Sequence, residues 1–351
     1  MNSPSLSTDF VVWKARRYSV QGYLVAMGIG GLLMLMLLGG ALYAMRMAKS
    51  LPPPQFSNSL CIDEKINSMR KSPPRDPTLL VVGSSVAWRH FNGAEATALA
   101  PGLKPFNAGF CGAKMTVVDK VVTWLTGRLP SVNRVLLIAS PFDFEGCTKP
   151  DPSKFDVKDA DDFIFGGSSA IKYYARYFDP ITLADNARTI RRARVDITAP
   201  DPLVQDQYGD APNQPAESRG LFYGAAIPDD ACFASLRRIA HQLDRRGIAF
   251  DMTITPLHPE WTRQFAPPSY AENFNARLLR SLAGTRARFH PTPYQPRLSA
   301  FYDAIHIRWS ATPDFTAALM RRVDMPRSAP RALAAIDNLS SRSGDGAVGR
   351  R

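Results

Sequence analysis

The stretch Thr78-Leu-Leu-Val-Val-Gly-Ser-Ser-Val-Ala-Trp-Arg89 governs how the rest of the sequence is interpreted. An apolar run ends at Gly83, two serines follow, and a helix-compatible segment comes next. The pattern predicts a buried parallel strand, a tight turn and the N-terminus of a helix. Ligands of α/β sheets bind at the carboxyl ends of strands, where helix amides favour negative charge. The simpler interpretation is that Ser84 or Ser85 only caps the helix.

Strand and helix patterns alternate after this stretch. Apolar runs bounded by Gly, Pro or charge are typical of strands buried on both faces. The predicted strands are Leu79–Gly83, Leu103–Asn107, Arg134–Ala139, Ile248–Thr255 and Ala287–His290. The predicted helices are Lys114–Arg128, Asp230–Arg246, Ser269–Ala283 and Ser310–Arg322. This alternation predicts an α/β fold with a mostly parallel, five-stranded sheet that carries helices on both faces.

Residues 148–228 interrupt the alternation. They are rich in Asp, Pro, Gly and Tyr and contain no clear strand, although a helix is predicted near Ile181–Arg194. Long insertions in compact domains are commonly functional. Because this one follows the third strand, we expect it at the carboxyl edge of the sheet as a lid or substrate wall. Its arginine cluster is better explained as a solvated helix face than as a site for an anionic polymer.

Residues 22–45 form an uncharged apolar segment. At about 1.5 Å per residue it can cross a hydrocarbon core of about 30 Å. A secretory signal peptide has a shorter apolar core and a clear cleavage site, so an uncleaved transmembrane helix is the better interpretation. Three basic residues precede the segment and two follow it, which predicts a cytoplasmic tail at residues 1–21 and a periplasmic C-terminal domain. The expected location is a bacterial inner membrane, and the opposite topology is the alternative.

The remaining boundaries follow from composition. Proline-rich runs predict an extended stalk over residues 46–77, with a short helix at Cys61–Lys71. The globular domain is predicted over residues 78–326 and a disordered tail over 327–351. The net charge of +12 is concentrated beside the apolar segment and in the tail, which argues against a nucleic-acid partner.

Four cysteines occur, at positions 61, 111, 147 and 232. They lack the spacing of a zinc or thioredoxin site, and no histidine cluster has metal-ligand spacing, so neither a metal nor a cofactor is predicted. In an oxidising compartment the cysteines can form two disulfides in three connectivities. A bridge between Cys111 and Cys147 would fasten two loops beside Ser85. The alternative is four buried thiols.

The second stretch that carries chemistry is Phe301-Tyr-Asp-Ala-Ile-His-Ile-Arg-Trp-Ser310. Asp303 and His306 lie three residues apart, just before a predicted helix. In such a loop Asp303 can hold the imidazole tautomer while His306 accepts the proton of a serine hydroxyl. A serine that ends the first strand, together with an Asp-x-x-His motif that opens the last helix, is far more specific than either feature alone.

With these motifs, residues 78–322 outside the insertion resemble the SGNH (GDSL-like) hydrolase superfamily. The resemblance implies a flavodoxin-like three-layer α/β/α sandwich. Gly83-Ser84-Ser85 is similar to the first family block, with Ser85 as the nucleophile. Asn107-Ala-Gly-Phe-Cys-Gly112 is similar to the second, in which the backbone N–H of Gly112 joins that of Ser85 in the oxyanion hole. Asp303-Ala-Ile-His306 is similar to the last.

Two positions depart from the family pattern. Ser84 replaces the family aspartate, and residues 138–144, Ile-Ala-Ser-Pro-Phe-Asp-Phe, lack the asparagine that donates to the oxyanion. Losing one such donor costs on the order of 100- to 1,000-fold in rate. Asp143 and His258 follow the third and fourth strands, where we expect substrate contacts, although a structural role for either is the alternative.

Two functions are therefore expected. The first is a membrane-anchored serine esterase or O-acyltransferase, whose resemblance implies O-acetyl groups of cell-surface polysaccharide, or a small ester, as substrate. The second is a catalytically inactive module of the same fold that binds glycan or an envelope-assembly protein. The missing asparagine favours the second.

Overall fold

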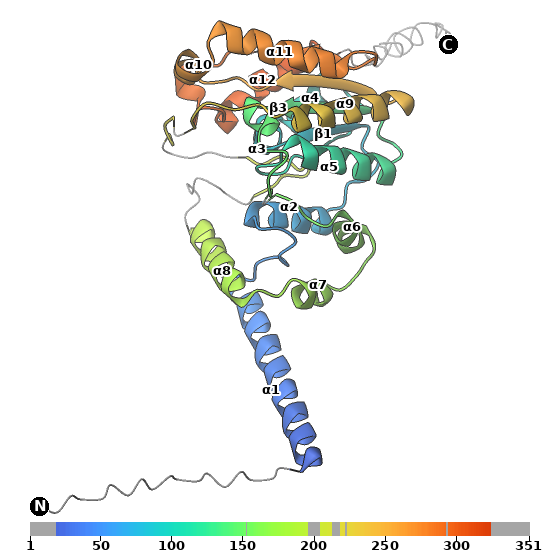
Figure 1. Cartoon of the computed structure of the whole chain (residues 1–351), viewed down its shortest axis with the longest axis vertical. Coiled ribbons are helices and arrows are strands. Elements are labelled where there is room, and N and C mark those ends of the chain that lie inside the picture. Colours follow the sequence, from blue (N-terminus) through green and yellow to red (C-terminus); the bar gives the residue numbers. More distant parts are fainter. Residues whose placement is uncertain are drawn as a thin grey trace, which may run out of the picture. The chain divides into compact units, whose positions relative to one another are not determined.

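The computed structural model describes residues 19–151, 153–195, 204–212, 218–221, 223–292 and 294–323. The chain divides into two compact units, Met1–Leu51 and Pro52–Arg351. In the first unit, helix α1 (Val20–Met47) is long and apolar enough to span a membrane (Figure 1). Most of the predicted cytoplasmic tail and the whole of the predicted disordered tail lie outside the described residues.

The second unit is built on a sheet of five parallel strands. They are β1 (Leu79–Gly83), β2 (Pro105–Asn107), β3 (Arg134–Ala139), β4 (Ala249–Ile254) and β5 (Arg288–His290). The spatial order is β2-β1-β3-β4-β5, which confirms the predicted five-stranded parallel sheet. The strand order reverses between β1 and β3. Doubly wound sheets with this order bind their ligands in the crevice at that reversal.

Alternate residues of β1 enter two different cores. Leu80 and Val82 belong to a cluster with the buried faces of α5 (Met115–Arg128) and α9 (Asp230–Arg245). Leu79 and Val81 belong to a second cluster with α3 (Ser85–His90) and α12 (Thr312–Met320). Helices therefore contribute to the cores on both faces of the sheet, which explains why the central strand β1 is apolar at every position.

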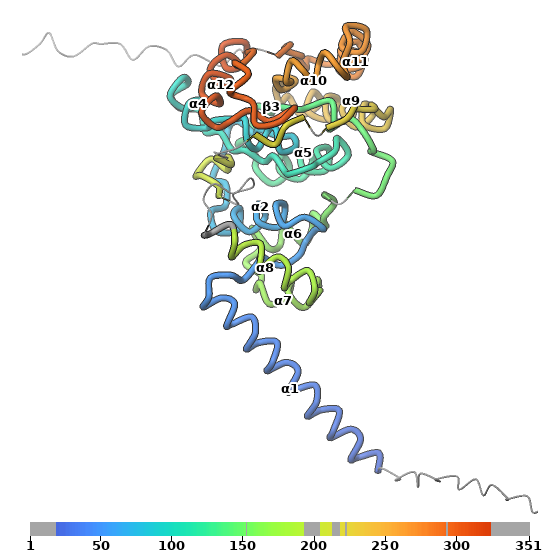
Figure 2. The backbone as a smooth tube through the Cα atoms, turned by 90° about the vertical axis from the view of Figure 1, so that its left-hand side faces the viewer, coloured from blue at the N-terminus to red at the C-terminus, as the bar shows by residue number. Residues whose placement is uncertain are grey.

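Helix α2 (Leu60–Lys71) is a core element. Ile62, Ile66 and Met69 are fully or almost fully buried and belong to the first cluster. Figure 2 shows α2 beside α6 (Val157–Phe165), with which it is in contact. The predicted helix is confirmed, but residues 52–77 are part of the compact unit instead of an extended stalk. The apolar residues of α2 recur every three or four positions, as on one face of a helix. They lie between the proline-rich runs on which the prediction of a stalk was based.

Two disulfides link segments that are distant in the sequence. Cys61 of α2 pairs with Cys111, and Cys147 pairs with Cys232 of α9. The bridge between Cys111 and Cys147, which the sequence suggested as one possibility, is therefore not formed. The alternative of four free thiols is also wrong, because all four cysteines are paired. Each bridge attaches a loop at the carboxyl edge of the sheet to a helix, because Cys111 and Cys147 follow β2 and β3.

The remaining helices complete the unit. They are α4 (Gly93–Leu99), α7 (Ala170–Arg176), α8 (Pro180–Val195), α10 (Pro259–Phe265), α11 (Pro268–Leu282) and the 3-10 turns Pro141–Phe144, Leu298–Ala300 and Trp309–Ala311. The insertion at 148–228 contains α6, α7 and α8, of which only α8 was predicted.

The substitution Ile66→Ala tests whether α2 belongs to the core. Removing a fully buried isoleucine side chain leaves a cavity and is expected to lower the free energy of unfolding by about 2 to 5 kcal/mol. Lys71→Ala, at an exposed position of the same helix, should change it by less than about 0.5 kcal/mol. Denaturant unfolding measures both, and equal small effects would contradict the assignment.

Candidate active site

The turn after β1 exposes Ser85 because Gly83 has no side chain. Gly83 adopts a φ of +143°, and a Cβ there would lie 2.1 Å from the carbonyl oxygen of Ile138. The chain can therefore leave the strand sharply, with Ser84 as the N-cap of α3 and Ser85 as its first residue. Ser84 is buried, whereas Ser85 is half-buried at the carboxyl end of the sheet.

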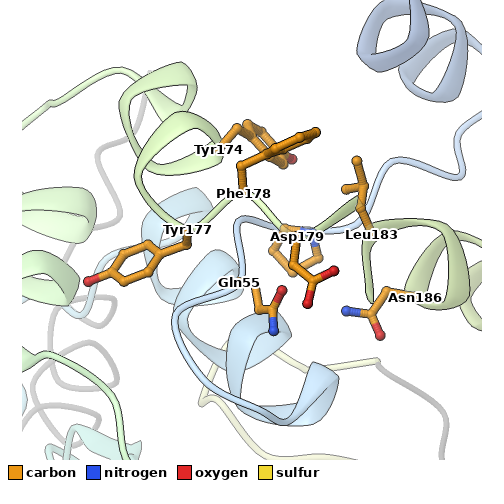
Figure 3. A pocket seen from close by; sticks show the side chains of 8 residues that line it. Gln55, Tyr174, Tyr177, Phe178, Asp179, Leu183 and Asn186 are labelled. Atoms are coloured by element: carbon orange, nitrogen blue, oxygen red, sulfur yellow. The ribbon is translucent and has the colours of Figure 1, made fainter. Parts of the chain in front are cut away.

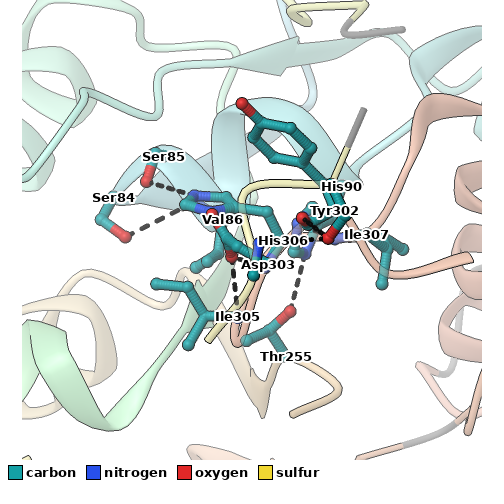
Figure 4. Close-up of polar contacts among 12 residues, drawn as sticks. Ser84, Ser85, Val86, His90, Thr255, Tyr302, Asp303, Ile305, His306 and Ile307 are labelled. Atoms are coloured by element: carbon teal, nitrogen blue, oxygen red, sulfur yellow. Dashed lines mark hydrogen bonds and ion pairs between the residues drawn. The ribbon is translucent and has the colours of Figure 1, made fainter. Parts of the chain in front are cut away.

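Ser85, His306 and Asp303 form a connected series (Figure 4). The hydroxyl oxygen Oγ of Ser85 lies 2.8 Å from Nε2 of His306, and Nδ1 of His306 lies 2.9 Å from Oδ2 of Asp303. An ionised carboxylate only accepts hydrogen bonds, so the imidazole proton is on Nδ1. Nε2 then accepts the hydrogen bond of the Ser85 hydroxyl, which is the arrangement that a general base requires.

Backbone amides hold Asp303 in this position. Its Oδ1 accepts the N–H groups of Ile305 and His306, at 2.9 Å and 2.8 Å. Burial alone raises the pKa of the Asp303 carboxyl, but the hydrogen bonds from His306 and from these amides outweigh burial and leave the pKa below its ordinary value. Asp303 is therefore ionised at neutral pH.

The backbone N–H groups of Ser85 and Gly112 lie at this edge and have no acceptor within the described part of the chain. The loop that carries Gly112 is attached to the turn after β1, because the amide of Phe110 donates to the carbonyl of Gly83. A Cβ at Gly109 would lie 2.7 Å from the amide nitrogen of Trp88, so a glycine permits this approach. Gly112 itself is exposed and has a φ of +65°.

Helix α2 fastens both ends of the same loop. Cys61 is bonded to Cys111, and the buried ammonium of Lys65 donates to the carbonyls of Asn107 and Gly209, both at 2.6 Å. Burial lowers the pKa of Lys65 to about 7. The sequence interpretation missed this contribution. The available signal was a lysine on the apolar face of α2, between Ile62 and Ile66.

Asn107 and Asp210 extend this buried cluster into the insertion. The side-chain amide of Asn107 donates to Oδ1 of Asp210, at 2.7 Å, and Oδ2 of Asp210 accepts the amide of Gly93, at 2.6 Å. Burial raises the pKa of Asp210 to about 8. The side chain of Asn107 is thus fully engaged inside the protein, and its contribution to the site is to position the loop that leads to Gly112.

Asp143 lies beneath the site and faces inward. Its carboxylate accepts the amide and the hydroxyl of Ser140, at 2.9 Å and 3.0 Å, and is hydrogen-bonded to Ser84. Burial raises its pKa to about 6. Asp143 is therefore not placed to contact a substrate as predicted, because both of its carboxylate oxygens accept hydrogen bonds that hold the turns after β1 and β3.

His258 lies at the same edge but also has a structural contact. Its Nδ1 accepts the amide of Glu260, at 3.2 Å, as the N-cap of α10, and its own amide donates to the carbonyl of Ala304. The backbone of His258 thus supports the loop that carries Asp303 and His306. The ring packs edge-on against Phe301, with centroids 5.1 Å apart.

The end of the insertion borders His306. The hydroxyl of Ser218 and the amide of Arg219 both donate to the carbonyl of Tyr302, and Gly220 forms a bridge with Asp303. The ring of Tyr223 then lies 6.5 Å from that of His306, centroid to centroid. The end of the insertion, with Tyr223, therefore forms a wall beside the imidazole.

A separate pocket lies between the insertion and residues 53–55, and it shares no residue with this site (Figure 3). Its lining includes Gln55, Tyr174, Phe178, Asp179, Leu183 and Asn186. Within the described ranges, no group of three or more His, Cys, Asp or Glu side chains is arranged to hold a metal ion.

Replacing Asp143 tests the raised pKa of that carboxyl. A carboxyl whose pKa is about 6 when folded and 3.8 when unfolded stabilises the fold below pH 4 and loses that contribution as the pH rises through 6. Between pH 4 and pH 7, Asp143→Asn should therefore gain stability relative to the wild type, by up to about 3 kcal/mol. The free energies of unfolding of the wild type and the variant, each measured at pH 4 and pH 7, test this expectation. If the difference between the two proteins is the same at both pH values, the pKa of Asp143 is not raised.

No protein-family model and no curated protein sequence significantly matches this chain.

Proposed function

We propose that the protein is a membrane-anchored serine esterase or O-acyltransferase with a divergent SGNH-type site. Ser85 is the nucleophile, His306 the general base and Asp303 the residue that orients and stabilises the imidazole. The 2.8 Å contact between Ser85 Oγ and His306 Nε2 carries the proposal, because a serine becomes nucleophilic when a base takes its proton. The two residues are separated by 221 positions in the sequence, so local structure alone does not explain their contact.

The mechanism follows from the orientation of the three groups. The Oγ of Ser85 attacks an ester carbonyl while Nε2 of His306 accepts the hydroxyl proton, and Asp303 stabilises the imidazolium. The amides of Ser85 and Gly112 stabilise the oxyanion. The intermediate expels the alcohol, which takes the proton from Nε2, and leaves an acyl-serine. Water or a sugar hydroxyl then attacks the acyl-serine with His306 as the base, so esterase and transferase differ only in the acceptor.

Several features support the proposed setting. The strand order agrees with a flavodoxin-like three-layer α/β/α sandwich, which the SGNH resemblance also implies. Helix α1 supplies an anchor, and two disulfides are typical of an oxidising compartment such as the periplasm of a bacterium. With this topology the domain meets cell-surface polysaccharide, whose O-acetyl groups we propose as the substrate.

One observation favours a second candidate. Residues 138–144 contain no asparagine, so the third family donor to the oxyanion is missing. The alternative function is therefore a catalytically inactive module that uses the wall beside Tyr223 to bind a glycan or an envelope-assembly protein. This candidate predicts glycan binding without acylation of Ser85.

The substitution Ser85→Ala distinguishes the two. In the full chain, reconstituted in nanodiscs, a fluorophosphonate probe should label the wild type, and p-nitrophenyl acetate should be hydrolysed. Ser85→Ala should abolish labelling and lower kcat/KM by at least about 1,000-fold, since the nucleophile is lost. Ser131→Ala, which removes a hydroxyl at the opposite end of the sheet, should leave both unchanged. An unlabelled wild type would support the binding module.

A further inference from the structure

We propose that His90 is a positioning residue that fixes the distance between nucleophile and base by holding the loop of His306 against the helix of Ser85. This inference rests on the proposed catalytic function, which gives the distance its importance. His90 is the last residue of α3, the helix that Ser85 begins. It was not identified by any motif in the sequence.

The contacts of His90 define its tautomer. Its Nε2 accepts the backbone amide of Ile307, at 3.1 Å, and its Nδ1 lies 2.6 Å from Oγ1 of Thr255 (Figure 4). A backbone N–H can only donate, so Nε2 must present a lone pair. The imidazole proton is therefore on Nδ1 and is donated to Thr255. The imidazole can fill this role only in its neutral form.

The surroundings keep His90 neutral. The side chain is fully buried, and burial is the main reason why its pKa lies well below the ordinary value. Positive charge on His306 or on Arg89 opposes protonation further. The other elements in contact with the ring contribute Thr255 and Phe315, which are uncharged. His90 therefore does not compete with His306 for the proton of the serine.

The loop of His306 presents three successive amide N–H groups. Asp303 accepts those of Ile305 and His306, within the loop itself. The third, that of Ile307, is accepted by His90 from a different element. This is the hydrogen bond that ties the backbone beside the base directly to the helix of the nucleophile. The two imidazole rings meet edge-on, with centroids 5.8 Å apart, so the ring of His90 also limits how far His306 can retreat from Ser85.

The first test measures the tautomer without reference to activity. The chain has five histidines, so imidazole nitrogen spectra of the full chain labelled with ¹⁵N-histidine can be assigned from single His→Gln variants. We expect one neutral imidazole that is protonated on Nδ1, disappears in His90→Gln and does not titrate between about pH 8 and pH 5. A proton on Nε2 of His90, or titration within this range, would overturn the proposal.

The second test measures the rate of fluorophosphonate labelling at Ser85. His90→Phe keeps an aromatic ring but removes the acceptor, and it should slow labelling by about 10- to 100-fold, because a misplacement of about 1 Å costs that much. His90→Gln retains an acceptor and a donor and should recover much of the rate. Thr255→Val should slow labelling as well, whereas Thr255→Ser should not, since only the former leaves Nδ1–H without its partner.

Controls separate positioning from folding and from the proposed function. His241→Gln replaces a histidine on α9, outside the site, and should label at the wild-type rate. Melting temperatures and intact disulfides establish that each variant is folded. Equal rates in folded wild type and His90→Phe, or equal losses in folded His90→Phe and His90→Gln, would overturn the proposal. An unreactive wild type would instead refute the catalytic function, while the tautomer measurement would still decide whether His90 holds Ile307.

Discussion

The arrangement depends on how closely two backbone segments approach at the end of β1. Gly83 has no room for a side chain beside Ile138, and Gly109 has none beside Trp88. These contacts allow the chain to turn from strand to helix within two residues and bring the loop after β2 against the same turn. A Cβ at either position would have to displace backbone atoms, which the packed sheet resists. This fit places the Ser85 hydroxyl at the carboxyl edge of the sheet, together with the amides of Ser85 and Gly112, which have no acceptor among the described residues.

Many of the residues that hold the site in place are polar and buried. Burying them costs free energy, but their hydrogen bonds then favour a single arrangement of the loops. Lys65, Asp210 and Asp143 are all buried near the carboxyl edge of the sheet, and burial shifts each pKa toward the neutral form. Their hydrogen bonds go to backbone and side-chain groups of the turns after β1, β2 and β3 and of the segments packed against them. Networks of this kind favour one arrangement of the loops, because any other leaves buried polar groups without partners. A disulfide from α2 to Cys111 adds a covalent restraint to the same loop.

The insertion after β3 belongs to the site through its two ends. Its beginning is attached to α9 by the bridge between Cys147 and Cys232, and its end pairs with the loop of Asp303. Between them, the segment around Asp210 reaches the cluster of Lys65 and Asn107. The insertion is therefore anchored at several points around the sheet edge, and its Tyr223 lies beside the imidazole of His306.

The sequence by itself located the strands of the sheet and the N-terminal apolar helix. Apolar runs and turn residues located all five strands, and the long uncharged segment located α1, because such apolar segments leave strong local patterns. The positions of Ser85, Asp303 and His306 at strand and helix ends were also predictable. Tertiary structure alone decided the pairing of the cysteines, the place of α2 in the core, and the inward orientation of Asp143. The reason is that a disulfide, a buried lysine or an imidazole such as His90 acts through a partner that is tens or hundreds of residues away in the sequence. Neither the spacing of residues nor the composition indicates which partner the fold brings within bonding distance.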